Sequence, residues 1–264
     1  MRALRVLREV DLIAAEDTRR TARLLQHYSI ATPTTSLHEH NEHGKSPHLI
    51  AKLQEGLSIA LVSDAGMPLV SDPGATLVRA ARAASIPIQV VPGPSAITAA
   101  LAGAGISGSF AFLGFPPASG KARKRWMTEV GQITLRVPAV FFESPHRLAR
   151  TMRELADILG NRPIIAAREL TKVHETLVEQ PIMAWLSSFA DAGADRGEHV
   201  VIISAADPDS PGLQQKPDDD ALLAEIGLLT NNGDMGVKAA SKALALKYGM
   251  SASELYALHA RHNK

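Results

Sequence analysis

Cysteine is absent from this chain of 264 residues. Its absence excludes disulfides, thiolate zinc sites and cysteine nucleophiles, and it fits a reducing compartment. An excess of charge of one sign is also lacking, because 28 Lys and Arg face 27 Asp and Glu. No global field therefore draws the chain to nucleic acid or to a membrane, and any RNA site must be a local patch.

Long hydrophobic runs are missing too. No apolar segment approaches the roughly 18 residues that a membrane span needs, and the chain does not open on a basic and then apolar signal segment. We therefore expect a soluble, cytoplasmic protein with no membrane partner. At roughly 150 residues per domain, the length suits about two domains with cores of their own.

Short apolar runs alternate with helix-period segments through most of the chain, which is typical of parallel α/β sheets. The expected strands are residues 12–15, 34–37, 59–63, 88–91, 110–114, 139–142, 164–168 and 199–204. The expected helices between them lie near residues 17–29, 47–55, 73–84, 95–104, 119–130, 145–159 and 181–189.

The chain opens on an amphipathic helix, residues 1–10, where such a sheet usually has its first strand. We expect an α/β fold in two domains with a small helical module after them. The divisions are an N-terminal α/β domain without its first strand, a second α/β domain, a Pro- and Asp-rich linker and the helical module: 1–106, 107–206, 207–217 and 218–264.

The segment SDAGMPLVSDPG, Ser63 to Gly74, follows an expected strand, at the edge where open α/β sheets bind ligands. Its glycines permit close backbone approach, and we expect Asp72 to cap the next helix with Pro73 in its first turn. A second turn, VVPGPSA, places Ser95 as the cap of another helix. Neither segment contains lysine or arginine, so the pair favours an uncharged or positively charged ligand over a polyphosphate.

The histidine-rich segment HEHNEH, His38 to His43, offers imidazoles and Glu42 to a divalent ion. It has neither H-E-x-x-H nor H-x-x-E-H spacing, and histidines in a polar loop are more often solvated or hydrogen-bonded. We expect no metal here, and a metal-dependent hydrolase centred on this segment is the weakest alternative.

An ordered series of motifs covers nearly the whole chain. The motifs are AAEDTRRT (14–21), HEHNE (38–42), SDAGMPLVSDPG (63–74), VPGPSA (91–96), FLGFPP (112–117), FFESPHRL (141–148), ARELTKVHET (167–176) and RGEHVVII (196–203). In these motifs the chain resembles the tetrapyrrole methylase superfamily, and within it the branch that acts on ribosomal RNA.

The resemblance implies two α/β domains, usually in a homodimer, with S-adenosylmethionine bound in the cleft between them. For the ribosomal RNA branch it implies 2′-O-methylation of a cytidine in the 16S rRNA of the small ribosomal subunit. A sulfonium cofactor carries positive charge, which suits a loop without lysine.

Two features depart from the family pattern. Family members begin with a strand and a P-x-P-I-G-N-like loop before the first helix; we favour a start codon assigned too late, because the remaining strands keep apolar character suited to a complete sheet. Met67 stands where the family usually has threonine, so a hydroxyl that could contact the ligand is replaced by a flexible thioether.

The resemblance and the turn geometry together indicate the site. The expected cofactor-binding residues are Asp64, Ala65, Gly66, Met67, Pro68, Val70, Asp72, Pro73, Pro92, Gly93, Pro94, Ser95 and Ser144. Methyl transfer to a ribose hydroxyl needs alignment and a group that takes the proton, and it needs no metal. The expected catalytic residues at strand ends are Glu16, Glu143, His146 and Lys172. Helix capping and structural ion pairs are their ordinary alternatives.

Two basic segments predict contact with RNA phosphates. KARKR gives four cations in five residues, and the tail from Gly236 to Lys264 has five Lys or Arg against Glu254 alone. The tail carries two helical stretches with a capping-box pattern at Ser251, similar to the helix-turn-helix-like module of the resembled family. The expected RNA-binding residues are Lys121, Arg123, Lys124, Arg125, Arg147, Lys238, Lys242 and Lys247.

Two further alternatives remain open at this stage. A methylase of a tetrapyrrole or another small molecule shares the fold, although the two basic segments argue against it. A non-catalytic RNA-binding protein would result if the absence of the first strand had removed cofactor binding.

Overall fold

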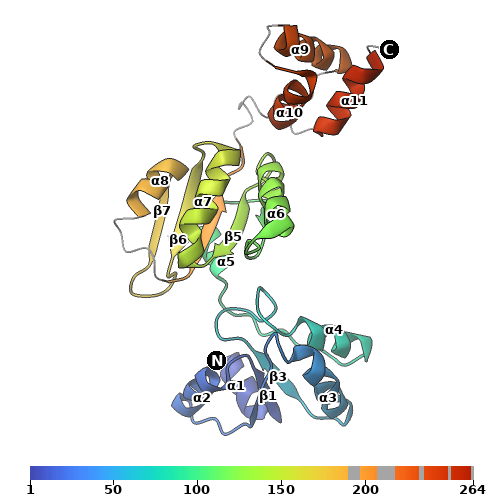
Figure 1. The fold of residues 1–264 in the computed structure, drawn as a ribbon. Helices are drawn as coiled ribbons and strands as arrows, with labels where there is room; N and C mark the ends of the chain where they lie inside the picture. The colour runs from blue at the N-terminus through green and yellow to red at the C-terminus, as the bar shows by residue number, and fades with distance from the viewer. Residues whose placement is uncertain (190–196, 207–217, 232–234, 249–250, 263–264) are drawn as a thin grey trace. The chain divides into compact units, whose positions relative to one another are not determined.

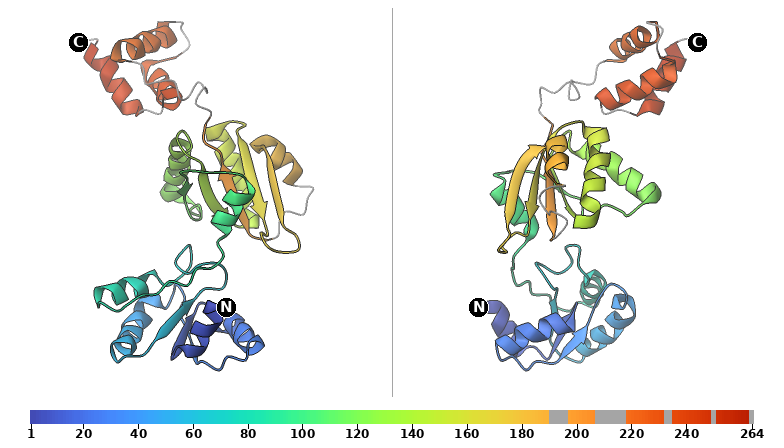
Figure 2. Two further views of the ribbon diagram at one scale, coloured as in Figure 1. Left: turned by 180° about the vertical axis from the view of Figure 1, so that it is seen from behind. Right: turned by 60° about the vertical axis from the view of Figure 1, so that its left-hand side comes forward.

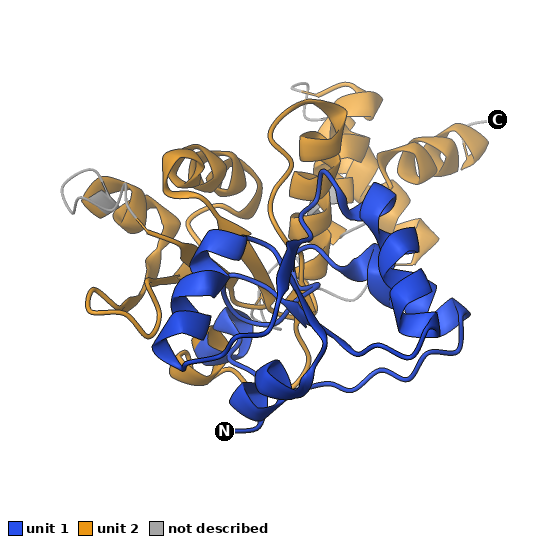
Figure 3. Cartoon of the chain, turned by 90° about the horizontal axis from the view of Figure 1, so that it is seen from below, with its two compact units in different colours: residues 1–99 blue, residues 100–264 orange. Residues whose placement is uncertain are grey.

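The computed structural model describes residues 1–189, 197–206, 218–231, 235–248 and 251–262. The chain divides into two units, residues 1–99 and 100–264 (Figure 3). The predicted linker over residues 207–217 lies outside the described residues. Within the described part, no helix is long and apolar enough to cross a membrane.

Unit 1 is built on a parallel sheet with helices on both faces (Figure 1). Its elements are α1 (Arg2–Glu9), β1 (Leu12–Ala15), α2 (Thr18–His27), β2 (Thr34–Ser36), α3 (Glu42–Gln54), β3 (Ile59–Val62) and α4 (Ala75–Ala83). The strand order is β2-β1-β3. Ile13 and Ala15 pack with α1 and α2, whereas Ala14 packs with α3 and α4. Because successive side chains point to opposite faces, an unbroken apolar strand is what two covered faces require.

The predicted strand over residues 88–91 is wrong. Residues 86–95 form neither helix nor ladder, and Ile88 and Val90 are 44% and 62% exposed. An apolar run favours burial, but a strand also needs a hydrogen-bonded neighbour. Among the strands that the structure describes, β3 pairs only with β1. The apolar residues therefore predicted a strand here, but no neighbouring strand is present with which this segment could pair among the described residues.

Unit 2 contains a mixed sheet of strand order β4-β5-β8-β6-β7. Its elements, with a helix that starts in unit 1, are α5 (Ala96–Gly103), β4 (Ala111–Phe112), α6 (Gly120–Ile133), β5 (Ala139–Glu143), α7 (Pro145–Leu159), β6 (Pro163–Arg168), β7 (Thr176–Pro181), α8 (Ile182–Phe189) and β8 (His199–Ile203). Only the β4–β5 pair is parallel; the other pairs are antiparallel. The predicted parallel pattern is therefore wrong in this unit, and β7 was not predicted.

The error has a physical reason. Strands β6 and β8 are buried on both faces, so their continuous apolar runs look like parallel strands. Helices α6, α7 and α8 share one core against the sheet (Figure 2). In this core the Trp126 and Phe141 rings are edge to face, with their centroids 5.2 Å apart. On α5, a Cβ added to Gly103 would lie 2.8 Å from Leu177 Cδ1 of β7, so glycine permits the contact. The exposed edge strand β7 has no such apolar run.

The chain after residue 218 is helical, as predicted. Its described elements are α9 (Asp219–Asn231), α10 (Val237–Tyr248) and α11 (Ala252–His262). Leu222, Ile226, Leu244 and Leu255 form a buried cluster among these three helices. The helices thus have an apolar core of their own.

Candidate active site

The carboxyl ends of β1 and β3 are joined through two carboxylates. The Asp64 amide donates to Glu16 Oε2 at 3.0 Å, and the Asp17 amide donates to Asp64 Oδ1 at 3.3 Å. Asp17 also caps α2 by accepting from the Arg19 amide at 2.8 Å. Because parallel strands end at the same edge, Glu16 lies at the edge where ligands bind in open α/β sheets.

The loop after β3 contacts the segment before α5. A Cβ added to Gly66 would lie 3.5 Å from the Pro94 carbonyl oxygen, and one added to Gly93 would lie 3.3 Å from Met67 Sδ. The two predicted turns are therefore neighbours in unit 1, and glycine on each side permits the approach. The predicted cofactor-binding residues of this unit lie on these segments, each partly or fully exposed: Asp64, Ala65, Gly66, Met67, Pro68, Val70, Asp72, Pro73, Pro92, Gly93, Pro94 and Ser95.

Backbone strain gathers in two of the predicted loops. Among the described residues, six that are not glycine have positive φ, and four of these lie in the loops after β3 and β6: Leu69 (73°), Ser71 (66°), Glu169 (50°) and Thr171 (69°). Left-handed backbone costs free energy for residues with a Cβ and persists where the surroundings fix it, commonly at functional sites. The presence of left-handed residues in the loops after β3 and β6 supports a functional role for both loops.

The charges around the first loop suit a cationic ligand. Residues 63–74 contain Asp64 and Asp72 and no lysine or arginine. The expectation that no cation faces these carboxylates is wrong, however, because Arg20 of α2 lies 3.4 Å from Asp64. The Arg20 side chain is 70% exposed, so this ion pair is weak.

Glu42, rather than Asp72, caps helix α4. The helix begins at Ala75, and the amides of Gly74 and Thr76 donate to Glu42 Oε1 at 3.1 and 2.5 Å. Asp72 lies too early to cap it, so that prediction is wrong. A buried carboxylate at a helix N-terminus satisfies free amides and complements the helix dipole.

The histidine-rich segment is divided between a polar turn, residues 38–41, and the start of helix α3. Helix α3 starts at Glu42 and includes His43, which is exposed, while His38 Nε2 lies 3.0 Å from Asn41 Nδ2. Among the described residues, no three His, Cys, Asp or Glu side chains are grouped to hold a metal. Glu42 is engaged in capping, which explains its acidic type without a metal.

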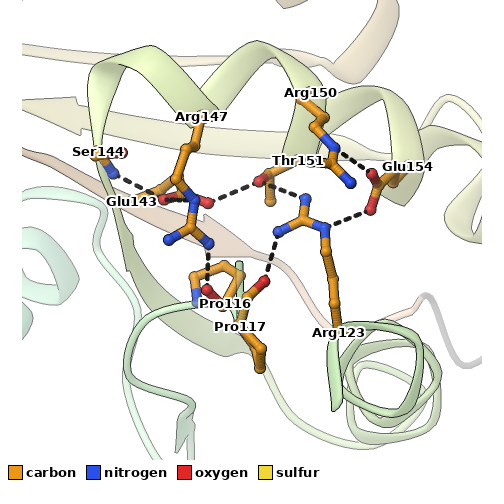
Figure 4. Close-up of polar contacts among 9 residues, drawn as sticks. All are labelled: Pro116, Pro117, Arg123, Glu143, Ser144, Arg147, Arg150, Thr151 and Glu154. Carbon is orange, nitrogen blue, oxygen red and sulfur yellow. Dashed lines mark hydrogen bonds and ion pairs between the residues drawn. The ribbon is translucent and has the colours of Figure 1, made fainter. Parts of the chain in front are cut away.

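Glu143 is buried at the end of β5 and fully engaged in hydrogen bonds (Figure 4). Its Oε1 accepts from the Ser144 amide at 2.9 Å and lies 3.4 Å from Arg147 Nε, and its Oε2 accepts from the Thr151 hydroxyl at 2.7 Å. Arg147 also donates to the Pro116 carbonyl. Glu143 therefore lies in a closed hydrogen-bond network of unit 2, and Arg147, whose side chain is 34% exposed, takes part in it. Catalysis by Glu143 and RNA contact by Arg147 stay predictions.

Arg123 is buried, so its prediction as an RNA contact is wrong. Its guanidinium donates to Glu154 Oε2 at 2.7 Å, to the Pro117 carbonyl at 3.0 Å and to the Thr151 hydroxyl at 2.9 Å (Figure 4). Together with Arg147 it fixes the turn of the FLGFPP motif. The sequence held the signal, because Arg123 is in helical register with the buried residues Trp126, Met127 and Val130.

The other cations of KARKR are on the surface. Lys121, Lys124 and Arg125 are exposed on α6, and they remain RNA-binding predictions. Lys238 and Lys242 are exposed on α10, whereas the side chain of Lys247 lies outside the described residues. Ser251 precedes α11, and its hydroxyl lies 2.6 Å from the Ser253 hydroxyl.

Lys172 is held in a compact polar turn after β6. Its ammonium donates to Glu169 Oε1 at 2.9 Å and lies 3.5 Å from a carboxylate oxygen of Glu198. The hydrogen bond to Glu169 raises the pKa of Lys172. Glu169 Oε1 also accepts from the Glu198 amide at 3.0 Å, and a Cβ on Gly197 would lie 2.5 Å from Glu169 Cγ. Gly197 is therefore required for this turn.

A row of polar residues crosses the end of the second sheet. His199 of β8 pairs with Glu143 of β5 on one side and with Arg168 of β6 on the other. His199 is only 3% exposed, and burial lowers its pKa. His146, the second residue of α7, is exposed, and Ser144 is partly exposed. Sequence reasoning did not single out His199, although it lies within the RGEHVVII motif, because a histidine before an apolar run indicates no particular chemistry.

The sheets and helices of the two units are those of an α/β protein, and the glycine loop after β3 lies at the edge where such sheets bind ligands. Residues 1–184 match the model of the tetrapyrrole (corrin/porphyrin) methylases, and the chain belongs to this family. The resemblance expected from the motifs is confirmed.

Curated relatives are similar over most of their length. A protein of Vibrio cholerae named ribosomal RNA small subunit methyltransferase I is 41% identical over 260 residues, which cover 97% of this chain and 87% of that protein. Proteins of the same name from Pseudomonas aeruginosa and Thermotoga maritima are each 43% identical and cover 86% and 77% of this chain, with 82% and 90% of their own lengths matched.

Solved structures support the fold alone. A cobalamin biosynthetic enzyme, cobalt precorrin-4 methyltransferase, aligns with a TM-score of 0.56 at 15% identity over 79% of this chain and 90% of its own. A diphthine synthase aligns with a TM-score of 0.58 at 15% identity over 78% of this chain and 83% of its own.

Proposed function

We propose that the chain transfers a methyl group from S-adenosylmethionine to the 2′-hydroxyl of a cytidine in the 16S rRNA of the small ribosomal subunit. The observation that carries the proposal is 41% identity across 97% of the chain to a protein named as a small subunit rRNA methyltransferase. The neighbouring glycine loops of unit 1 support it, because they offer backbone and carboxylates to an adenosyl sulfonium.

S-adenosylmethionine supplies a methyl group on a sulfonium that is already activated for in-line displacement. The remaining task of the protein is alignment, exclusion of water and removal of one proton. Asp64, Gly66 and Gly93 of unit 1 hold the donor in this proposal, and Ser144 stays a prediction from the sequence. The hydrogen bonds from the Asp64 amide to Glu16 and from the Asp17 amide to Asp64 fix the strand ends from which the first loop starts.

The four predicted catalytic residues differ in their fitness as a base. Glu143 is buried with both oxygens bonded, and Lys172 has a raised pKa that keeps it protonated at neutral pH. Glu16 uses only Oε2 in the hydrogen bonds of the described residues, and His146 is exposed. We assign proton removal to Glu16 or His146, and we assign Lys172 to charge stabilisation.

The proposal includes a homodimer in the cytoplasm, where the small ribosomal subunit is assembled. Lys121, Lys124, Arg125, Lys238, Lys242 and Lys247 are its RNA contacts. The test is methylation of small subunits that lack the modification, followed by nucleoside mass spectrometry for 2′-O-methylcytidine. The absence of that nucleoside, with a folded protein that binds S-adenosylmethionine, contradicts the proposed substrate.

A matched pair of glycine variants tests the cofactor loop. Gly66 and Gly56 both have positive φ, 73° and 95°, but only Gly66 lies at the carboxyl end of β3 beside Pro94. Gly66→Ala and Gly56→Ala both add the same backbone strain, of about 1 kcal/mol. Calorimetry with S-adenosylmethionine is expected to show weaker binding, by about tenfold or more, for Gly66→Ala only. Equal affinities contradict this placement.

A further inference from the structure

Helices α1 and α2 carry six exposed arginines, which together we call the arginine face. It consists of the exposed residues Arg2, Arg5, Arg8, Arg19, Arg20 and Arg23. The only acid within the two helices is Glu9, so six positive charges against one leave them with a net charge of +5. The whole chain carries only +1, which makes this a local concentration of charge.

The two helices present these arginines from one layer of unit 1. Leu7 of α1 and Leu25 of α2 lie in the same buried cluster against one face of the sheet. The Arg8 guanidinium donates to the Tyr28 carbonyl at 3.1 Å, which joins the end of α1 to the end of α2. On α1 the arginines recur at every third position, which places them on one side of the helix. The face is therefore a continuous part of one helical layer.

Half of these arginines have no carboxylate partner among the described residues: Arg19 lies 2.8 Å from Asp17 and Arg20 lies 3.4 Å from Asp64, whereas Arg2, Arg8 and Arg23 form no ion pair there. Arg5 lies 3.9 Å from Glu9, and both side chains are about two-thirds exposed, so the pair contributes little. Among the residues that the structure describes, no carboxylate lies within ion-pair distance of Arg2 or Arg23. The guanidinium groups therefore remain available to an external anion.

The face also reaches the candidate cofactor loop. Arg20 lies 3.4 Å from Asp64, the residue that opens this loop and is bonded to Glu16. A chain of phosphates lying along the arginines would thus pass beside the strand ends where the methyl donor is proposed to bind. Arginine suits this task because its planar guanidinium binds phosphate oxygens in pairs.

We propose that the arginine face binds the phosphate backbone of the RNA substrate and leads it to the site in unit 1. The inference rests on the proposed function and adds an RNA surface apart from α6 and the C-terminal helices. The contacts are to phosphates, so they set affinity and position rather than sequence preference.

The test compares two double variants of equal charge. Arg2→Gln with Arg23→Gln removes two cations of the arginine face, and Arg79→Gln with Arg82→Gln removes two exposed cations of α4, which packs on the other face of the same sheet. Binding to naked 16S rRNA and to small subunits is measured across a series of salt concentrations. The salt slope of log affinity is expected to fall by about 0.7 for each lost phosphate contact in the first variant and to stay unchanged in the second.

Arg2→Lys with Arg23→Lys keeps the charges and is expected to keep most of the slope. Equal slopes for the two glutamine variants overturn the inference, as does a loss restricted to assembled subunits, which would indicate a ribosomal protein as partner. If the double variant melts at a lower temperature, the single variants Arg23→Gln and Arg79→Gln are compared in the same way. Failure of the wild-type protein to methylate subunits that it binds would count against the proposed function and not against this surface.

Discussion

Gly197 occupies a position that no residue with a side chain can take without rearrangement. Its φ is 85°, and an added Cβ would lie 2.5 to 2.7 Å from three atoms of the Glu169 side chain. One of these atoms, Glu169 Oε1, accepts hydrogen bonds from the Glu198 amide and from the Lys172 ammonium. The turn after β6 therefore depends on a glycine that follows Glu169 by 28 positions in the sequence, near the start of β8.

We predict that Gly197→Ala lowers the free energy of unfolding by roughly 2 to 4 kcal/mol, since backbone strain and a steric clash add. Gly105→Ala is the control, because Gly105 has φ 67° and no atom within 4 Å of an added Cβ. Its cost is expected to be the strain alone, about 1 kcal/mol. Urea denaturation of both variants measures the difference, and equal losses would show that Glu169 gives way freely.

His199 makes the stability of unit 2 depend on pH. Burial lowers its pKa in the folded protein, with Arg168 adding to the effect and Glu169 opposing it. The unfolded chain therefore binds a proton as the pH falls below about 6.5, while the folded chain does not. This destabilises the folded state by at most about 1.4 kcal/mol per pH unit between the two pKa values. The stability contributed by the neutral, buried His199 is therefore fully present above pH 6.5 and is lost as the pH falls.

We predict that His199→Gln reduces this loss of stability below pH 6.5. His48→Gln removes an exposed histidine of α3 and is expected to keep the wild-type pH dependence. Thermal unfolding followed from pH 5 to pH 8 gives the comparison. The same slope in His199→Gln and in the wild type would mean that another group titrates.

At the scale of elements, α6 carries one buried and one exposed arginine. Arg123 is buried and bonded to Glu154 and Thr151, while Arg125, two residues further, is exposed. Removing one partner of a buried charged network leaves the others unpaired, at a cost of about 3 to 5 kcal/mol. Removing an exposed charge costs little stability.

We therefore predict that Arg123→Gln lowers the unfolding free energy by several kcal/mol, whereas Arg125→Gln leaves it within about 0.5 kcal/mol and weakens RNA binding. Urea denaturation and a filter-binding assay separate the two effects. The assignment fails if Arg123→Gln is as stable as the wild type, or if Arg125→Gln binds RNA as tightly as the wild type does.

Local pattern predicted most helices and strands of the chain, and it predicted that the two glycine turns belong together. It failed where a residue depends on distant partners. Residues 88–91 are apolar but lack a neighbour with which to pair, and β7 forms on the exposed edge of β6 without an apolar run. The type of residue also does not reveal burial. Glu42 and Arg123 are of types that usually lie on the surface, but both are buried and hydrogen-bonded in this structure.

At the scale of the whole molecule, the C-terminal helices form a part with its own core. Leu222, Ile226, Leu244 and Leu255 bury one another, so removal of residues 218–264 takes away the entire cluster and exposes none of it. From Gly236 onward the chain has five Lys or Arg against one acid. This composition suits contact with phosphates and has no evident part in binding the methyl donor.

We predict that deleting residues 218–264 weakens the use of the RNA substrate while the affinity for S-adenosylmethionine stays unchanged. The double variant Lys238→Gln with Lys242→Gln is expected to reproduce part of the loss, and Lys238→Arg with Lys242→Arg is expected to retain activity because the charge is kept. Methylation of small subunits at several salt concentrations, with calorimetry for the cofactor, measures both quantities. Because phosphate contacts are screened by salt, the deficit should narrow as salt weakens wild-type binding. Full activity of the shortened chain would remove these helices from RNA recognition and leave α6 and the arginine face as the RNA surfaces.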